Sequence, residues 1–347
     1  MLLTDMPFNH YFKLKKILYI GLLSLLMLVN KFALGQTTVY PHKFIVSQDG
    51  KGDFKTIQEA INTVRDLSQQ QVSIHIKKGI YHEKIVVPTW KTNISLIGEG
   101  ADETIITNAD YSGKPYIDTV DAYGKSNFTT YNSYTVLIQG NDFTAEGITI
   151  QNTAGRVGQA VALHVEADRV IIKDCKLLGN QDTLYTATEN SRQYYQHCYI
   201  VGTTDFIFGQ ATAVFQDCTI KSLSNSYITA ASTTPRQAYG FVFINCKLIA
   251  HVDAKKVYLG RPWRPHAKTV FIKCMMDKHI VPQGWDNWRN PTNEQTAYYA
   301  EYESTGPGSD SSQRANWSKQ LSQEQLKLYT LDEIFNNNGS WNPTINH

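Results

Sequence analysis

"VFQDCTIKS", residues 214–222, is one of five similar stretches that together decide the fold of this chain. Each stretch has an apolar pair, a partly polar segment, a cysteine, one variable residue and another apolar residue. The other four are "IIKDCKLLG" (171–179), "YYQHCYIVG" (194–202), "VFINCKLIA" (242–250) and "VFIKCMMDK" (270–278). The cysteines, Cys175, Cys198, Cys218, Cys246 and Cys274, are 20 to 28 residues apart. A degenerate repeat of this length predicts a solenoid in which each unit is one coil.

The residue types within the repeats favour strands over helices. They are rich in β-branched and aromatic residues and lack a helical period. Earlier stretches without cysteine have the same character, such as "VSIHIKKGIYHEKIVV" (72–87) and "TVLIQGNDFTAEGITIQN" (135–152). The sequence therefore predicts an all-β chain folded as a parallel β-helix.

The five cysteines allow two interpretations. They can form a buried ladder of small apolar side chains, one on each coil. Adjacent rungs lie about 4.8 Å apart, and this separation also permits a disulfide between neighbours. If one bridge forms, we expect Cys198–Cys218, because these two have the shortest spacing, 20 residues.

Both ends of a solenoid need a cover. "TIQEAINTV" (56–64) begins with the capping-box pair Thr56 and Glu59 and has a continuous apolar face, so it predicts an N-terminal capping helix. The stretch "LSQEQLKLYTLDEIF" (321–335) also has helical spacing. We expect it to form a helical and extended tail, over the far end or along the side.

The N-terminus has the pattern of a secretory signal peptide, which we assign to residues 1–35. Lys13, Lys15 and Lys16 precede a thirteen-residue apolar run, 17–29, and a small-residue cleavage site near Gly35. The run is short for a membrane span, so we expect no membrane anchor and a secreted or periplasmic location. Residues 36–347 then form a single β-helix domain.

The charge of the expected mature chain argues against nucleic acid as a partner. The whole chain has a formal charge of +2, and residues 1–35 contain four lysines and one aspartate. Residues 36–347 therefore carry 29 basic and 30 acidic side chains, a formal charge of −1. A protein that binds nucleic acid through its phosphates needs a basic surface.

Two aspartates share one position in the repeat. Asp182, in "GNQDTLYT" (179–186), and Asp205, in "GTTDFIFG" (202–209), each follow a cysteine by seven residues. Equal phase predicts that they stack on adjacent coils, within about 5–7 Å of each other. Two carboxyl groups at this distance do not both ionise easily. One of them can therefore donate a proton while the other acts as nucleophile or base. Alternatively, both are turn aspartates that accept backbone hydrogen bonds.

Further residues suit a site around this pair. Arg261, in "YLGRPWRP" (258–265), can keep one carboxylate ionised. Gln159 and Gln181 can donate amide hydrogen bonds to an oxyanion. Flat surfaces for sugar rings can come from the aromatic side chains Tyr185, Phe208, Trp263, Trp285 and Trp288, although each of them is also a candidate core residue.

The motifs of other hydrolases are absent. The sequence contains no G-x-S-x-G elbow for a serine nucleophile. It also contains no H-E-x-x-H or C-x-x-C spacing for a metal. We therefore expect neither a cofactor nor a metal.

From residue 43 to 342 the sequence resembles the pectin methylesterases, also called pectinesterases. The resemblance rests on "VSQDGKGDFKTIQEAI", "GITIQNTAG", "QAVAL", "GNQDTLY", "DFIFG", "YLGRPW" and "EYESTGPG". It implies a right-handed parallel β-helix that hydrolyses the C6 methyl esters of homogalacturonan and releases methanol. Because only the expected signal peptide precedes the match, we expect no inhibitory pro-domain, and we expect a monomer.

The resemblance also implies the role of each residue. Asp205 is the nucleophile and Asp182 the general acid, then base. Gln159 and Gln181 form the oxyanion hole, and Arg261 holds Asp205. The chain departs from the family pattern at Asn180, at Thr204 and in "AGRVG" (154–158), which affects the rim rather than the chemistry.

Two alternatives remain open at this point. One is another polysaccharide enzyme with a β-helix, either a lyase or a polygalacturonase, which would shorten the glycan chain. The other is a β-helix that binds cell-wall glycan without catalysis.

Overall fold

The computed structural model describes residues 8–32, 40–336 and 339–344, and the chain divides into two parts between Tyr40 and Pro41. The first part contributes the helix α1 (Phe8–Phe32), which includes the apolar run. Within the described ranges, no helix combines the length and the apolar character that a membrane span requires. The expected cleavage point near Gly35 lies outside the described residues, so the signal peptide stays a prediction.

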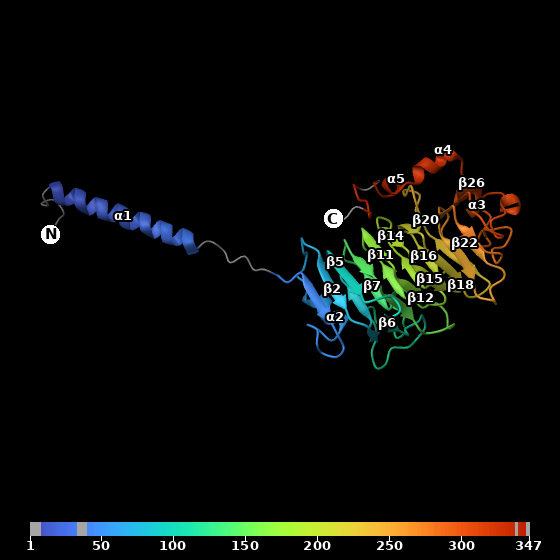
Figure 1. Ribbon diagram of the computed structural model, residues 1–347, viewed down its shortest axis with the longest axis horizontal. Helices are drawn as coiled ribbons and strands as arrows, with labels where there is room; N and C mark the ends of the chain where they lie inside the picture. Colours follow the sequence, from blue (N-terminus) through green and yellow to red (C-terminus); the bar gives the residue numbers. More distant parts are fainter. Residues whose placement is uncertain (1–7, 33–39, 337–338, 345–347) are drawn as a thin grey trace. The chain divides into compact units, whose positions relative to one another are not determined.

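The second part is a right-handed parallel β-helix, which confirms the predicted fold class (Figure 1). Successive strands visit three sheets in turn, and all paired strands run parallel. Among the described residues, sheet A has eleven strands: β1 (Lys43–Val46), β2 (Val72–Ile76), β5 (Ile94–Gly98), β8 (Thr144–Glu146), β11 (Val170–Lys173), β14 (Arg192–Gln196), β17 (Thr212–Gln216), β20 (Phe241–Ile244), β23 (Lys268–Ile272), β25 (Tyr298–Tyr302) and β26 (Lys319–Gln320).

The other two sheets complete each coil. Sheet B contains β3 (Gly79–Tyr81), β6 (Thr104–Asn108), β9 (Thr149–Asn152), β12 (Lys176–Leu178), β15 (Tyr199–Gly202), β18 (Thr219–Ser222), β21 (Lys247–Ala250) and β24 (Met275–Met276). Sheet C contains β4 (Ile85–Val87), β7 (Val136–Ile138), β10 (Leu163–Val165), β13 (Leu184–Thr186), β16 (Ile207–Gly209), β19 (Tyr227–Ala231) and β22 (Tyr258–Pro262).

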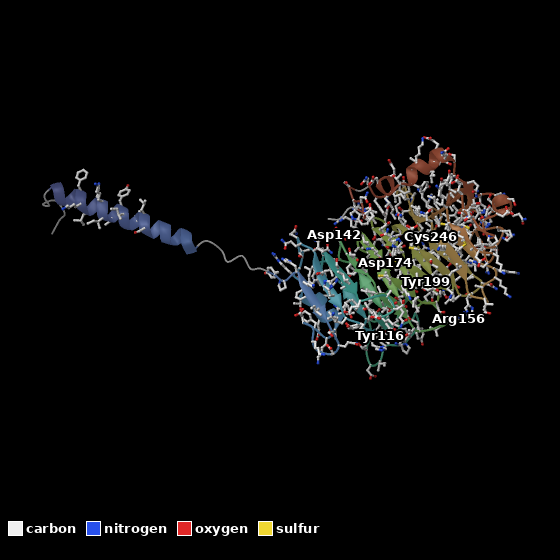
Figure 2. All side chains as sticks on the ribbon, viewed as in Figure 1. Tyr116, Asp142, Arg156, Asp174, Tyr199 and Cys246 are labelled. Atoms are coloured by element: carbon white, nitrogen blue, oxygen red, sulfur yellow. The ribbon has the colours of Figure 1, made fainter. Side chains whose placement is uncertain are left out.

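A one-residue turn explains the cysteine repeat. The residue before each cysteine has a positive φ, and this left-handed residue turns the chain from sheet A into sheet B: Asp174, His197, Asp217, Asn245 and Lys273, with φ between 51° and 54°. Asp, Asn and His tolerate this region better than most residues. Figure 2 labels two residues of these turns, Asp174 and Cys246. The cysteine that follows each turn points into the core.

The core consists of columns of like side chains. Every cysteine is buried, and each thiol donates a hydrogen bond to a backbone carbonyl of the preceding coil. A column of parallel rings runs beside them, through Tyr195, Phe215, Phe243 and Phe271, with centroids 4.4–4.7 Å apart. Rings at this spacing add attraction to their buried area. The columns therefore hold neighbouring coils in one register.

The cysteine ladder is the interpretation that the structure supports. All five cysteines are free thiols, so the Cys198–Cys218 disulfide, which we expected only if one bridge formed, is absent. The spacing could not decide this point, because a rung separation that suits a ladder also suits a bridge.

The N-terminal end is closed by the expected helix, and a buried ion pair lies at the other end. Helix α2 (Ile57–Thr63) has the predicted capping box between Thr56 and Glu59, and it buries Ile57, Ala60 and Ile61. At the other end, Glu301 lies in register with Phe271 and terminates the ring column. Its carboxylate pairs with the buried Arg314 at 2.8 Å and accepts a hydrogen bond from the Trp285 indole.

The C-terminal tail lies along the side, on the outer face of sheet A (Figure 1). It contains α4 (Gln323–Leu326), the 3₁₀ turn η3 (Lys327–Tyr329) and α5 (Leu331–Phe335). Ile334 and Phe335 pack on side chains of β14, β17, β20 and β23. The guanidinium of Arg192, on β14, donates to the carbonyls of Phe335 and Gly339.

Two irregular segments leave the coils. The helix α3 (Asn293–Thr296) and the 3₁₀ turn η2 (Ser311–Gln313) lie in connections near the C-terminal end. A longer segment, residues 109–135, connects β6 to β7 and contains the 3₁₀ turn η1 (Thr130–Asn132). We call residues 109–135 the excursion loop, because it departs from the coil and returns beside its starting point.

The structure predicts the behaviour of the thiols. Burial raises the pKa of both Cys198 and Cys218, and a thiol that stays protonated and buried reacts slowly. In the folded protein we expect essentially no reaction with a thiol reagent, and after unfolding without reductant we expect all five thiols to react. A count of three thiols in the unfolded protein would show that a disulfide forms.

Candidate active site

The two aspartates occupy equivalent turns on adjacent coils. Asp182 lies in the turn from sheet B into β13, and Asp205 lies in the turn into β16. Leu184 pairs with Ile207 in parallel register, so residues 23 apart share one position, which is the stacking that the cysteine phase predicts. Both aspartates have left-handed backbones, with φ of 66° and 49°. The stack ends there, because the register places Tyr227 beside Asp205 on the next coil, and Asn225, seven residues after Cys218, accepts backbone hydrogen bonds from Lys255 and Lys256.

Arg261 forms a bidentate ion pair with Asp205 alone. Its Nε lies 3.0 Å from Oδ1 and its Nη2 lies 2.6 Å from Oδ2. Two parallel hydrogen bonds fix a carboxylate more firmly than a single charge can. Arg261 lies on β22, two coils beyond Asp205, and its partner in the intervening strand is Ala230. The small side chain of Ala230 leaves the guanidinium room to reach back to Asp205.

Two aromatic rings contact the guanidinium. The guanidinium carbon of Arg261 lies 3.9 Å from the ring centre of Tyr227 and 3.7 Å from that of Trp288. Cation–π contacts at this distance stabilise a partly desolvated charge. The planar orientation of Arg261 is therefore fixed before any ligand binds.

The electrostatics of the two carboxyls differ. Burial raises the pKa of Asp205, and the hydrogen bonds from Arg261 oppose this rise. Burial also raises the pKa of Asp182, well above its ordinary value, and the nearby Asp205 raises it further. Within the described residues, the Asp182 carboxyl has no hydrogen-bonded partner. The surroundings therefore favour the protonated form more strongly at Asp182 than at Asp205, which Arg261 helps to keep ionised.

The alternative interpretation of the two aspartates fails. As simple turn residues, their carboxylates would accept hydrogen bonds from nearby backbone amides. In the described part of the chain no backbone amide donates to either carboxylate, and Asp205 is bonded to a side chain from another coil. The side chains thus point away from the turns, toward the surface of sheet C.

The two glutamines lie side by side. Gln159 and Gln181 form a parallel β-bridge, and the amide of Ala160 donates to the carbonyl of Gln181. Gln181 directly precedes Asp182, so both glutamines lie at the same edge of the site. Neither side-chain amide is hydrogen-bonded within the described residues, which leaves their N–H groups available to a ligand.

One cleft of about 280 Å³ contains most of the predicted site residues. It is lined by Gln159, Gln181, Asp182, Asp205 and Arg261, together with Phe208, Trp263 and Trp288, and also by Thr130, Tyr131 and Ala230. Tyr185 stacks on Phe208 with ring centres 4.5 Å apart, so it supports the cleft without lining it. Trp285 is a correction, because it is buried between Phe271 and Tyr299 in the core.

Sequence reasoning missed three residues near the pair. Thr130 and Tyr131 come from the excursion loop, and Tyr227 is the inner ring beneath Arg261. Tyr227 follows Asn225 by two residues and begins β19. Its place in the repeat could have shown that it lies one coil beyond Asp205. The excursion loop has no such phase, so nothing in the sequence placed Tyr131 against the cleft.

The arrangement suits attack on a carbonyl carbon. An ionised carboxylate provides the nucleophile, and a neighbouring carboxyl group provides a proton. Two amides beside them can stabilise the negative charge that develops on oxygen. Aromatic walls suit the apolar faces of sugar rings.

Comparison with known proteins finds similar pectinesterases. The Pectinesterase family model matches residues 43–338. Putative pectinesterase 11 of Arabidopsis thaliana is 38% identical, and the match covers 87% of this chain and 81% of that protein. Pectinesterase 3 of Solanum lycopersicum is 39% identical over 79% of this chain and 50% of that protein. The chain spans about half the length of several curated relatives that it matches.

Solved structures show the same fold. A pectin methylesterase from carrot is 36% identical with a TM-score of 0.76, and the match covers 86% of this chain and 94% of that one. A pectin methylesterase from Erwinia chrysanthemi is 31% identical with a TM-score of 0.72, covering 89% and 100%. A mutant pectin methylesterase in complex with a hexasaccharide is 32% identical with a TM-score of 0.73, again covering 89% and 100%.

The unpaired carboxyl of Asp182 should reduce stability. Because its folded pKa is raised, its contribution to stability falls as the pH rises from the ordinary carboxyl value through the raised one. Asp182→Asn is uncharged at every pH. We therefore expect this variant to gain about 0.5–2 kcal/mol in unfolding free energy near pH 8, and little at about pH 4, where the wild-type carboxyl is also protonated.

Denaturant unfolding at the two pH values measures this difference. Asp217→Asn is the matched control, because Asp217 is exposed and also has a left-handed backbone. It should change stability equally at both pH values. A gain for Asp182→Asn that does not depend on pH would contradict the raised pKa.

Proposed function

The chain belongs to the pectinesterase family, and from this premise we propose that it hydrolyses the C6 methyl esters of homogalacturonan to methanol and free galacturonate. The observation that carries the proposal is the bidentate Arg261–Asp205 pair beside the unpaired Asp182. It supplies a nucleophile and an acid in one cleft. The hexasaccharide complex of a related pectin methylesterase supports a polysaccharide ligand.

In the first proposed step Asp205 attacks the ester carbonyl carbon. The carbonyl oxygen becomes an oxyanion, to which the amides of Gln159 and Gln181 donate. As the intermediate collapses, the bond to the methoxy oxygen breaks and Asp182 transfers its proton to that oxygen. Methanol leaves, and Asp205 carries the galacturonyl group as an anhydride.

The second step returns the enzyme to its starting state. Asp182 is now ionised and takes a proton from water, whose oxygen attacks the acyl carbon. Collapse of the second oxyanion expels Asp205 as a carboxylate. Asp182 is again protonated and Asp205 again paired with Arg261, so each cycle consumes one ester and one water.

We further propose that the protein acts outside the cytoplasm. The lysines and the apolar run of the N-terminal 35 residues support export, and residues 36–347 would then be the mature domain. We propose that it acts as a monomer on pectin, because the whole site comes from one chain.

The test is methanol release from highly methylated pectin. We expect the wild type to release methanol without shortening the polymer, which distinguishes it from a lyase or a polygalacturonase. Asp205→Ala and Asp182→Ala should each lower turnover by several orders of magnitude. The exposed-turn variant Asp217→Ala is the control and should keep its activity. Near wild-type turnover in either site variant, with unchanged circular dichroism, would refute the assignment.

Arg261 should set the acidic limb of the pH profile. Asp205 must be ionised to attack, and Arg261 opposes the rise in its pKa that burial causes. In Arg261→Ala the carboxyl ionises only at higher pH, so the acidic limb of kcat/KM moves upward. We also expect kcat/KM to fall by about 10²–10³-fold, and Arg261→Lys to keep partial activity because it retains the charge.

The pH profile of the purified variants checks this expectation. Arg236→Ala is a control for the loss of an arginine, because Arg236 is exposed and pairs with Glu189. Its acidic limb should match the wild type. An unmoved limb in Arg261→Ala would mean that another group keeps Asp205 ionised.

A further inference from the structure

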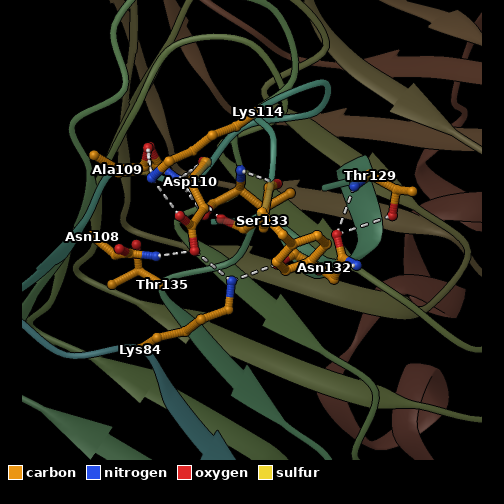
Figure 3. A network of polar contacts seen from close by, with 12 residues as sticks. Lys84, Asn108, Ala109, Asp110, Lys114, Thr129, Asn132, Ser133 and Thr135 are labelled. Atoms are coloured by element: carbon orange, nitrogen blue, oxygen red, sulfur yellow. Dashed lines mark hydrogen bonds and ion pairs between the residues drawn. The ribbon is translucent and has the colours of Figure 1, made fainter. Parts of the chain in front are cut away.

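A compact ion cluster lies outside the cleft, at the base of the excursion loop (Figure 3). Asp110 accepts hydrogen bonds from Lys84 at 2.7 Å, from Lys114 at 2.7 Å and from Asn108 at 2.9 Å. The Asp110 side chain is 10% exposed. The Lys84–Asp110 pair is more buried than an ordinary surface pair.

Lys84 joins the two ends of the excursion loop. Its Nζ binds Asp110 at the start of the loop and also donates to the carbonyl of Asn132 at the end, at 2.5 Å. It also lies 4.6 Å from the ring centres of Phe128 and Tyr134. Lys84 itself directly precedes β4, a strand of sheet C. One ammonium group thus ties both ends of a 27-residue loop (109–135) to the β-helix.

The base of the loop is bonded to the segment that contains Gln159. The amide of Ser112 donates to the carbonyl of Gln159 at 2.9 Å. The hydroxyl of Ser133 accepts from the amide of Val161 at 3.2 Å. The side-chain amide of Asn152 donates to the carbonyls of Asp110, Ser133 and Val161. Gln159 and its neighbours are therefore fixed by the loop on one side and by the Gln181 segment on the other.

The charge of Asp110 persists at acidic pH. Burial alone would raise the pKa of Asp110, but the hydrogen bonds from Lys114, Lys84 and Asn108 together hold it below the ordinary value. The ion cluster therefore favours the charged form of Asp110.

We propose that Lys84 and Asp110 are positioning residues for catalysis: by closing the base of the excursion loop they hold the amide of Gln159 in place, and they hold Thr130 and Tyr131 as one wall of the cleft. Neither Lys84 nor Asp110 lines the cleft. Their effect passes through the backbone of residues 110–112 and 132–133. This inference rests on the proposed esterase function for its kinetic test, but not for its structural one.

The kinetic test is a double-mutant cycle on methanol release. Lys84→Met keeps the apolar stem and removes the charge, and we expect it to lower kcat about tenfold with a smaller change in KM. Gln159→Ala should lower kcat by about 10²-fold. If Lys84 acts through Gln159, the double variant should be no slower than Gln159→Ala alone. If the two substitutions instead lowered kcat independently, so that their factors multiplied in the double variant, the proposal would be overturned.

Two further variants separate positioning from general stability. Lys84→Arg retains the charge and the contact with the rings, so it should recover most of the lost turnover. Lys77→Met is the matched control, because it also removes a lysine that pairs with a carboxylate, Glu99 at 2.7 Å, but away from the loop. It should leave kcat unchanged. If kcat also fell tenfold in Lys77→Met, the effect of Lys84→Met would be due to lost stability and not to positioning.

The structural test needs no substrate. Hydrogen exchange should show that the amides of Ser112 and Val161 exchange faster in Lys84→Met than in the wild type, while core amides of β14 and β17 do not change. If Lys84→Met folds poorly, hydrogen exchange of the same amides can be compared between Asp110→Asn and the wild type. Unchanged exchange at both amides in a folded variant would refute the positioning role, even if the protein released no methanol from pectin.

Discussion

The in-register stacking of consecutive coils determines where every group in the cleft lies. A left-handed residue and a cysteine turn five successive coils at the same point, and the ring column from Tyr195 to Phe271 keeps four of these coils aligned. Side chains alternate between the two faces of a strand, so a slip of one residue would turn Phe208 inward. Asp182 and Asp205 lie on adjacent coils at the same position because they are 23 residues apart, and the paired residues of the strands that follow them, Leu184 and Ile207, are also 23 residues apart.

This stacking places two carboxyl groups close together, and only one of them is paired with an arginine. Two buried carboxyls at one rung separation repel each other when both are ionised. Arg261 reaches only Asp205, because β22 lies on the far side of that coil from Asp182. The rings of Tyr227 and Trp288 then restrict the guanidinium to this one carboxylate. The surroundings of the two carboxyls differ because the strand order of sheet C places Arg261 beside Asp205, and not because of their own local sequences.

The sequence predicted those features that repeat. The cysteine phase predicted the β-helix and the stacked aspartates, and the capping box predicted α2, because each depends on residues that are close in sequence or equivalent in successive coils. Features that depend on one particular contact were not predicted. Trp285 and Trp288 are three residues apart, yet one is in the core and one in the cleft. Tyr131 belongs to a loop whose place is set by Lys84, far earlier in the chain.

The site therefore combines residues held by the stacked coils with residues from irregular loops, and these two parts differ in how well they tolerate substitution. Arg261 lies on β22, and Asp182 and Asp205 lie in turns whose backbone amides bond to the next coil, so the stacking of the coils sets the spacing of these three residues. The wall at Thr130 and Tyr131 and the outer bonds of Gln159 come from irregular backbone. Such backbone stays ordered only while its polar groups have partners, and the Lys84–Asp110 cluster supplies these at the loop base. Substitutions within the loop can therefore change how the cleft meets its ligand, while the charges of the aspartate pair remain as the coils set them.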